Sequence, residues 1–371
     1  MGLCTAYCAS LMGKKVTILE KLTIPNKEAA SFSLTRSIRN DYLDPLYSLL
    51  AYESQKLWLD LQKFSDEKFF IKCGCLNLAR KDVTPELKKT YALKSYQNLK
   101  SLKLNAKQLN KSALKNKFPQ FEADLGSLDV EAGFLYLPQI TKTLLRLFRQ
   151  TMYDRIEFVQ NVKVQSINEF SEGVKLKTDK GVFQANKLVI TAGIWTNQVL
   201  KIIKNCQVQF PIYEDKPSQC KYFIPPKKDL SRFTSTNLPV FAYLDVGIYG
   251  HPVLLGKTRG VKISYYNPPD IKKISDSRIQ SIEDFVKICM PTLAGAKVID
   301  VKDADQCSYD MVKDKNFIIG KLPGFKNIFI GTGWNGTGYK FAPIVGKILS
   351  ELLIPGQTMY DIARFSPERF L

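Results

Sequence analysis

The sequence predicts a mixed α/β fold in which a Rossmann-like dinucleotide-binding domain is interleaved with an antiparallel-sheet domain. Residues 2–20 show a helical apolar face followed by a β-branched strand that ends at Glu20. Residues 331–352 show a glycine-rich loop followed by apolar residues at helical spacing. Residues 207–305 alternate short strands with proline-containing loops, as an antiparallel sheet does.

Composition limits the possible functions. A chain of 371 residues can form two or three domains, and its 45% hydrophobic and 24% charged residues are typical of a globular protein. No apolar run is long enough to span a bilayer. The net charge is +19, but the lysines are spread along the chain without a nucleic-acid-binding motif. We therefore expect no nucleic acid and no membrane as partners; an anionic substrate explains the charge more simply.

Cysteine and histidine usage argues against a metal site. The eight cysteines lack the paired spacing of a zinc site, and a single histidine, His251, rules out a histidine-rich site. Catalysis by a Ser-His-Asp or Cys-His arrangement would depend on that one residue. Without a secretory signal, reduced thiols in an intracellular compartment are expected, either the cytoplasm or the peroxisome. The final Arg369-Phe370-Leu371 is not a peroxisomal S-K-L address.

Residues 2–20 have the length and the ends of part of a dinucleotide-binding unit. In such a unit a glycine-rich turn precedes the helix, and an acid at the end of the second strand binds the ribose. Gly2 matches the last glycine and Glu20 the acid. We expect the chain to begin at this glycine, without the first strand, as a start at an internal Met or a truncated gene model would produce. A plain helix–strand pair without a ligand stays open.

The following segment contains two arginines three residues apart, Arg36 and Arg39. A guanidinium forms a two-pronged hydrogen bond with a carboxylate, although a solvated pair on a loop is the ordinary alternative. Beyond them, residues 44–63 predict a helix and residues 69–78 a strand. Residues 88–114 are lysine-rich and predict a helix with a solvated face.

A buried strand then leads into a small-residue turn. Residues 140–152 predict an amphipathic helix and residues 162–167 and 174–178 predict strands. An apolar strand at 188–191 runs into Ala192 and Gly193, with Trp195 behind them. Small residues let the backbone pass close to a dinucleotide, although a buried strand that ends in an ordinary glycine turn also fits.

The C-terminal block begins with a lone cysteine, Cys307. Strands are expected at 316–320 and 327–330, followed by a loop that contains Gly333, Gly336 and Gly338 and is closed by Lys340. A loop of this kind at a helix N-terminus offers backbone N–H groups to an anion or an electron-rich heterocycle. An ordinary βα turn has the same pattern.

The order of these features resembles the monomeric sarcosine oxidase and peroxisomal sarcosine/pipecolate oxidase family of flavin-dependent amine oxidases. The resemblance spans almost the whole chain from Gly2. Its most specific parts are Cys307, Lys262, Lys340 and TAGIWTNQ at residues 191–198. It implies FAD as the cofactor, covalently attached through the sulfur of Cys307, and a monomer as the simplest state.

The resemblance also implies roles for individual residues. Arg39 and Lys340 would bind the substrate carboxylate. Lys262, in GVKISYY, would lie beside the flavin where O2 reacts, and Tyr249 would line the substrate pocket. The residues expected at FAD are Cys307, Gly2, Glu20, Arg36, Ala192, Gly193, Trp195, Gly333, Gly336 and Gly338.

The resemblance implies an oxidase of secondary amino acids, such as sarcosine or L-pipecolate, that acts on the CH–NH group and forms an imine and H2O2. The FAD-binding domain would comprise residues 1–68, 140–210 and 312–371, and the substrate domain residues 69–139 and 211–311. Departures from the family pattern at Phe32, Leu34, Tyr266, Trp334, Asn335 and Thr337 leave the substrate open. An FAD-dependent amino-acid dehydrogenase, a deglycating oxidase of fructosyl amino acids and a truncated non-catalytic fragment remain alternatives.

Overall fold

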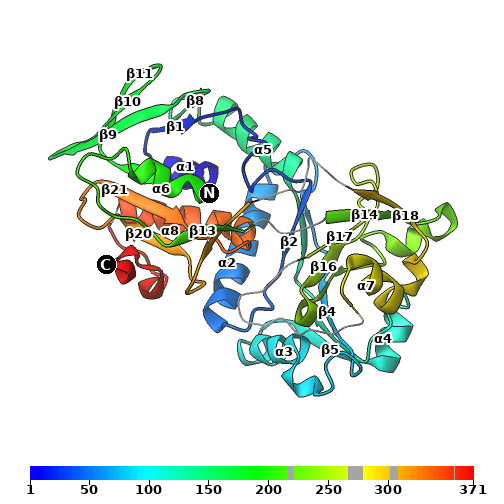
Figure 1. Ribbon diagram of the computed structural model, residues 1–371. Helices are drawn as coiled ribbons and strands as arrows, with labels where there is room; N and C mark the ends of the chain where they lie inside the picture. The colour runs from blue at the N-terminus through cyan, green and yellow to red at the C-terminus, as the bar shows by residue number, and fades with distance from the viewer. Residues whose placement is uncertain (216–219, 266–278, 301–307, 355) are drawn as a thin grey trace. The chain divides into compact units, whose positions relative to one another are not determined.

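The computed structural model describes residues 1–215, 220–265, 279–300, 308–354 and 356–371 of a mixed α/β chain (Figure 1). The chain forms two compact units. Unit 1 contains Met1–Phe32, Gln139–Lys216 and Cys307–Leu371, and unit 2 contains Ser33–Pro138 and Pro217–Gln306. Residues 33–68 thus fold within unit 2, and the assignment of a ligand to each unit stays a prediction.

Unit 1 contains two parallel strand pairings. Strand β1 (Val16–Glu20) pairs in parallel with β8 (Ile156–Gln160), and β12 (Leu188–Ile190) pairs in parallel with β21 (Ile328–Thr332). The other elements of this unit are α1 (Gly2–Leu11), α5 (Leu137–Gln150), β9 (Val164–Phe170), β10 (Gly173–Thr178), β11 (Gly181–Ala185), α6 (Thr196–Leu200), β13 (Ile212–Asp215), β19 (Tyr309–Val312), β20 (Ile318–Lys321) and α8 (Ala342–Leu353). The predicted helix and strand in residues 2–20 are confirmed.

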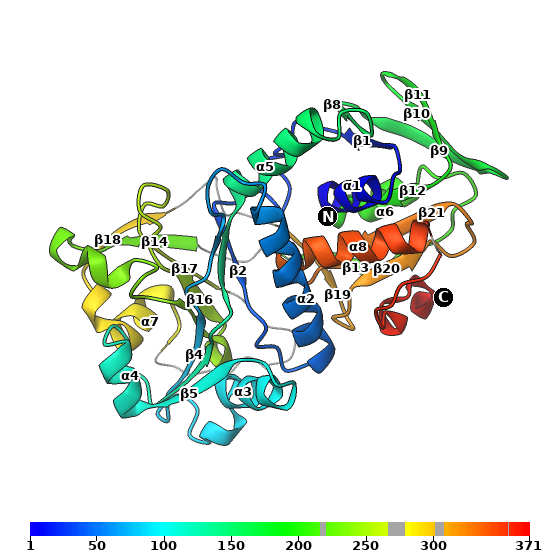
Figure 2. The ribbon, with the colours of Figure 1, turned by 180° about the vertical axis from the view of Figure 1, so that it is seen from behind.

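Helices α1 and α8 lie side by side (Figure 2). They approach so closely that a Cβ atom on Gly346 would lie 2.6 Å from the backbone carbon of Cys4. Because backbone atoms cannot move aside as the end of a side chain can, only glycine permits this contact. The glycine therefore sets the spacing of the two helices and the place of the α1 N-terminus.

Unit 2 is organised around one large sheet. Its eight strands follow the order β18-β14-β17-β16-β15-β4-β6-β5. Their bounds are β4 (Cys75–Ala79), β5 (Ala106–Asn110), β6 (Leu125–Asp129), β14 (Cys220–Ile224), β15 (Val240–Tyr243), β16 (Ile248–His251), β17 (Val261–Tyr265) and β18 (Lys297–Asp300). A second sheet has the order β2-β7-β3, formed by β2 (Thr35–Ile38), β3 (Phe70–Ile71) and β7 (Gly133–Tyr136). The helices are α2 (Pro45–Gln62), α3 (Tyr91–Ser101), α4 (Lys111–Lys117) and α7 (Ile282–Cys289).

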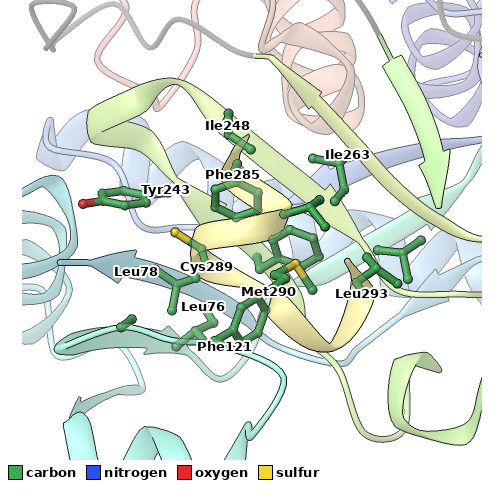
Figure 3. Close-up of a cluster of buried hydrophobic side chains, with 14 of the residues drawn as sticks. Leu76, Leu78, Phe121, Tyr243, Ile248, Ile263, Phe285, Cys289, Met290 and Leu293 are labelled. Carbon is green, nitrogen blue, oxygen red and sulfur yellow. The ribbon is translucent and has the colours of Figure 1, made fainter. Parts of the chain in front are cut away.

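The main hydrophobic core of unit 2 packs against one face of the large sheet. Successive side chains of a strand point to opposite faces, and Leu76, Phe241 and Ile263 all belong to the buried apolar cluster. Figure 3 shows side chains of helix α7, among them Phe285 and Cys289, packed into this cluster. The alternate residues of the same strands are consequently presented on the other face.

Short 3₁₀ segments complete the secondary structure. They are Leu87–Lys89, Gly193–Trp195, Lys227–Phe233, Leu244–Val246, Pro291–Leu293, Gly338–Phe341, Ala363–Phe365 and Pro367–Phe370. Within the described ranges, every helix is too short or too polar to cross a membrane.

Two predicted elements are wrong in detail. Residues 88–114 are not one helix: they form α3, the edge strand β5 and α4. In β5 the exposed polar residues suit a sheet edge as well as a helix surface, so the lysine-rich pattern does not distinguish the two. Residues 69–78 form two strands, β3 and β4, instead of one. Gly74, which lies just before β4, has a φ of +82°, and this left-handed backbone interrupts the extended conformation.

Core packing in unit 2 yields a first prediction. Leu76 is fully buried, whereas Leu59 on helix α2 is 41% exposed. Leu76→Ala should lower the free energy of unfolding by about 2–5 kcal/mol, because it removes buried apolar atoms and leaves a cavity. Leu59→Ala is the matched control and should change it by less than about 1 kcal/mol. Urea unfolding followed by tryptophan fluorescence measures both; equal effects would contradict the assignment of this core.

Candidate functional site

The face of the large sheet opposite the core carries polar side chains in two adjacent rows. In one row, β-sheet pairing joins Ser264 to Tyr249, Tyr249 to Ala242, Ala242 to Asn77 and Asn77 to Ser127. In the other row it joins Tyr222 to Lys262, Lys262 to His251 and Cys75 to Asp129. Residues paired across strands point to the same face. Lys262 and Tyr249, both predicted as catalytic, therefore lie on one surface.

Lys262 and His251 form a buried polar group on this face. Lys262 is 2% exposed, and its Nζ donates to the backbone oxygen of Thr35 at 3.4 Å. The ring of His251 is hydrogen-bonded on both sides, by Nδ1 with the Thr35 hydroxyl and by Nε2 with the Ser37 hydroxyl, each at 2.7 Å. Strand β2 thus holds both residues. A buried ammonium group placed in this way can stabilise an anion that forms beside it.

Arg39 lies in a second buried polar group, just beyond the end of β2. Its Nη1 donates to Oδ1 of Asp41 at 2.6 Å, to the Asp41 backbone oxygen at 3.0 Å and to the Tyr91 hydroxyl at 3.1 Å. Its guanidinium also stacks over the Tyr42 ring, 4.6 Å from the centroid. Arg39, which was predicted to bind the substrate carboxylate, therefore already has a carboxylate partner in its own unit.

Two further residues fix this arginine group. The amide of Asn77 donates to Oδ2 of Asp41, and the backbone N–H of Asn40 donates to Oδ2 of Asp129 at 2.7 Å. Burial, together with the charge of Asp41, raises the pKa of Asp129 to about 7. Near neutral pH this carboxyl group is therefore partly protonated.

Tyr249 lies close to the arginine group. Its partly buried ring packs against a small cluster that contains Tyr91 and Ala242. The backbone N–H of Tyr91 donates to Oδ1 of Asp245 at 3.0 Å, which holds the start of helix α3 against this face. Unit 2 thus brings Arg39 near Tyr249. Arg36, by contrast, donates to the Ser33 hydroxyl at 2.5 Å and to the Thr35 backbone oxygen at 3.3 Å.

Unit 1 contains the residues predicted to hold the dinucleotide. Helix α1 begins at Gly2 and has neither a side-chain cap nor an acidic residue in its first turn. A Cβ on Gly2 would lie 3.0 Å from Oγ1 of Thr191, so this end is tightly enclosed. Glu20 lies at the carboxyl end of β1, where its Oε1 accepts hydrogen bonds from Leu22 N and Asn26 Nδ2. This donor end and this carboxylate fit a pyrophosphate and a ribose.

The predicted turn after β12 adjoins the end of β21. Gly193 has a φ of +55°, and its carbonyl accepts a hydrogen bond from the Thr332 hydroxyl at 3.2 Å. Ala192 and Trp195 are joined by a backbone hydrogen bond of 3.1 Å. Thr332 immediately precedes the glycine-rich loop, so the two predicted cofactor segments meet within unit 1.

The glycines of the loop at 331–338 are required by the packing of the chain itself. A Cβ on Gly333 would lie 2.7 Å from Val312, on Gly336 2.7 Å from the Tyr309 ring, and on Gly338 2.5 Å from Trp334. Gly333 and Gly336 also have positive φ, at +72° and +69°. The loop is thus a rigid, closely packed turn. The 3₁₀ segment Gly338–Phe341 follows it and leads into α8.

A buried carboxylate fixes this loop. Asp310 accepts hydrogen bonds from Gly333 N at 2.8 Å and from the Thr332 hydroxyl at 3.2 Å. Burial raises the pKa of Asp310 to about 6. Asn335 completes the arrangement, because it donates to Gly333 O and accepts from Val312 N. The Gly333 N–H, which the sequence pattern offered to a ligand, therefore has an internal partner.

Two predicted site residues remain. Lys340 is buried in unit 1, and its Nζ donates to Oγ1 and to the backbone oxygen of Thr337 at 2.9 and 3.1 Å. Cys307 lies outside the described residues, as does Tyr266. Among the described residues no group of His, Cys, Asp and Glu side chains could hold a metal ion.

The sequence alone did not identify several residues of the two polar groups of unit 2, nor the buried acid of the loop in unit 1. The residues in question are Thr35, Ser37, Asp41, Asn77, Tyr91 and Asp129 in unit 2 and Asp310 in unit 1. Asp41 could have been noticed, because an acid two residues after a predicted carboxylate-binding arginine is an obvious competitor. The others come from distant strands and carry no local signal.

The raised pKa of Asp310 predicts a pH-dependent stability. Its pKa rises from 3.8 to about 6 on folding, so folding favours the protonated form. Its contribution to stability is complete below pH 3.8 and is lost as the pH rises through 6. The amide side chain of the Asp310→Asn variant cannot ionise. The difference in free energy of unfolding between the variant and the wild type should therefore shift in favour of the variant by up to about 3 kcal/mol between pH 4 and 7. Urea unfolding at several pH values tests this; parallel profiles would contradict it.

Comparisons with known proteins show relatives over the whole chain. Human peroxisomal sarcosine oxidase is 29% identical over 389 residues, with 100% of this chain and 93% of the relative covered. N-methyl-L-tryptophan oxidase of Salmonella dublin is 26% identical over 384 residues, with 100% and 96% covered. The solved structure of L-proline dehydrogenase from P. horikoshii superposes with a TM-score of 0.79 at 20% identity, covering 100% and 94% of the two chains, which establishes the fold.

A family model matches most of the chain. It is described as FAD dependent oxidoreductase and matches residues 1–352. The match covers the α1 N-terminus, both polar groups of unit 2 and the glycine-rich loop up to helix α8. The chain therefore belongs to the FAD dependent oxidoreductase family.

Proposed function

We propose that this chain is an oxidase of secondary amino acids, such as sarcosine, L-pipecolate or a similar N-alkyl amino acid, with O2 as the electron acceptor. The observation that carries the proposal is the buried Lys262 on the polar face of the large sheet. An ammonium group so completely removed from water is costly unless it serves an anion or is well hydrogen-bonded. The names of the human and Salmonella relatives support the substrate class.

FAD would supply the electron acceptor for oxidation of the carbon–nitrogen bond when bound. Helix α1, with Gly2 at its start, and Glu20 at the end of β1 would hold the dinucleotide. Ala192, Gly193 and Trp195 would line its path, and the loop with Gly333, Gly336 and Gly338 would supply a rigid edge. We infer from the sequence context of Cys307 that its sulfur is the covalent attachment point.

The residues of unit 2 would position the substrate. Arg39 would bind the substrate carboxylate and Tyr249 would line the pocket beside it. The role of Lys340 at the substrate carboxylate stays a prediction from the resemblance. Lys262, held by Thr35, would stabilise negative charge as oxygen is reduced. No general base is needed if the substrate binds as a neutral amine.

Oxygen consumption distinguishes the proposal from its closest alternative. An oxidase should consume O2 and release H2O2 when a secondary amino acid is added. An FAD-dependent amino-acid dehydrogenase should reduce an artificial dye but consume little O2. A screen that includes a fructosyl amino acid tests the deglycating alternative. A purified protein without visible flavin absorption and without activity in either assay would contradict the proposal.

Lys262 yields the sharpest test of the oxygen half-reaction. Lys262→Met keeps the length of the side chain but removes its charge, so the rate of O2 consumption at saturating amine should fall by about 100-fold or more. The rate at which the amine reduces the flavin in the absence of oxygen, measured as loss of the visible flavin absorption, should change much less. Lys107→Met, on the exposed edge strand β5, is the matched control and should leave both rates unchanged. Equal losses in both half-reactions would contradict the role given to Lys262.

The covalent attachment has its own measurement. Flavin that remains with the protein after acid precipitation would be covalent, and Cys307→Ala should release it into the supernatant. Cys206→Ala serves as the control, because Cys206 is a partly buried thiol elsewhere in unit 1. If flavin stays with the precipitated Cys307→Ala protein, the attachment point is another residue.

A further inference from the structure

The ion pair between Arg39 and Asp41 has the geometry of a filled carboxylate site. Oδ1 of Asp41 accepts from Nη1 of Arg39 at 2.6 Å, and Oδ2 accepts from the amide of Asn77. The Tyr91 hydroxyl lies 3.1 Å from the same Nη1. Each carboxylate oxygen thus has its own donor, as the oxygens of a bound carboxylate ligand would. The side chains of Arg39 and Asp41 are 7% and 1% exposed.

The charges around this pair leave little room for a second carboxylate. Asp129 lies in the same group, and one of the causes that raise its pKa to about 7 is the charge of Asp41. Asp41 therefore already lies near a second buried carboxyl group. A substrate carboxylate that approached Arg39 with Asp41 still in place would add a further negative charge beside Asp41 in a buried site, which is unfavourable.

We propose that Asp41 is a specificity-determining residue that competes with the substrate carboxylate for Arg39. The inference rests on the proposed function, in which Arg39 binds that carboxylate. The substrate carboxylate must then replace Asp41 as the partner of Arg39, so one charge-assisted hydrogen bond is lost for each one that is formed. The affinity of the wild-type protein for a simple amino acid is therefore low. Asp41 thereby favours substrates whose remaining groups bind strongly enough to displace it.

Removal of Asp41 should create a vacant carboxylate site that can be detected without any activity. In Asp41→Ala, Arg39 keeps its positive charge but loses its ion pair with Asp41, and breaking a buried ion pair by removing one partner is strongly destabilising. Sodium acetate should then raise the midpoint of thermal unfolding, because a ligand that binds only the folded state stabilises it. Sodium chloride and acetamide at equal concentration should not, and the wild type and Asp60→Ala, on the exposed face of helix α2, should show no acetate-specific shift.

Kinetics test the competition directly. Asp41→Asn, which keeps the side-chain shape, should lower KM for a secondary amino acid by about tenfold or more with little change in kcat. KM for the corresponding amine without a carboxylate should not fall. Asp60→Asn should change neither value. The split between KM and kcat distinguishes competition from general damage to the fold, which would lower kcat for both substrates.

The outcomes separate the two proposals. If Asp41→Ala does not fold, the acetate test is repeated on Asp41→Asn. A folded variant that responds to acetate no more than to chloride, or an unchanged or raised KM in Asp41→Asn, overturns the competition. If the wild type oxidises no amine but acetate stabilises Asp41→Ala specifically, the carboxylate site stands and the proposed function fails.

Discussion

The alternation of side chains along the strands of the large sheet is the constraint on which unit 2 depends. Every second residue must enter the apolar core, so Leu76, Phe241 and Ile263 are fixed on one face. The residues between them are then presented together on the other face. A shift of one residue in β17 would turn Lys262 toward the apolar core, and the same shift in β16 would do so for Tyr249. The same register that builds the core thus assembles the candidate site.

Unit 1 uses a different device, a glycine-rich loop held by a buried acid. Loop conformation is set by close packing against Tyr309 and Trp334 and by the hydrogen bonds that Asp310 accepts. A loop fixed in this way needs no reorganisation when a ligand arrives, which reduces the entropic cost of binding. The Asp310 carboxyl group is consequently held in a buried position that disfavours its ionised form.

Local pattern predicted much of the fold. Apolar spacing identified α1, α2 and α8, and alternation placed Lys262 on a strand, since both signals are contained in a short segment. The strand β5 was missed because an exposed edge strand and an exposed helix surface have the same polar composition. Pattern could not reveal the polar groups of the site. Cys75 meets Asp129 through strand pairing between distant segments, and Asn77 meets Asp41 through a hydrogen bond between their side chains.

The single histidine of the chain lies on the polar face, paired with Lys262 across two strands and stacked on Phe134 with ring centroids 5.6 Å apart. Its imidazole therefore gives one set of signals in a nuclear magnetic resonance spectrum, without overlap from other histidines. Both ring nitrogens are hydrogen-bonded to hydroxyl groups of strand β2. The chain thus contains a built-in spectroscopic reporter beside Lys262, which senses local changes without any added label.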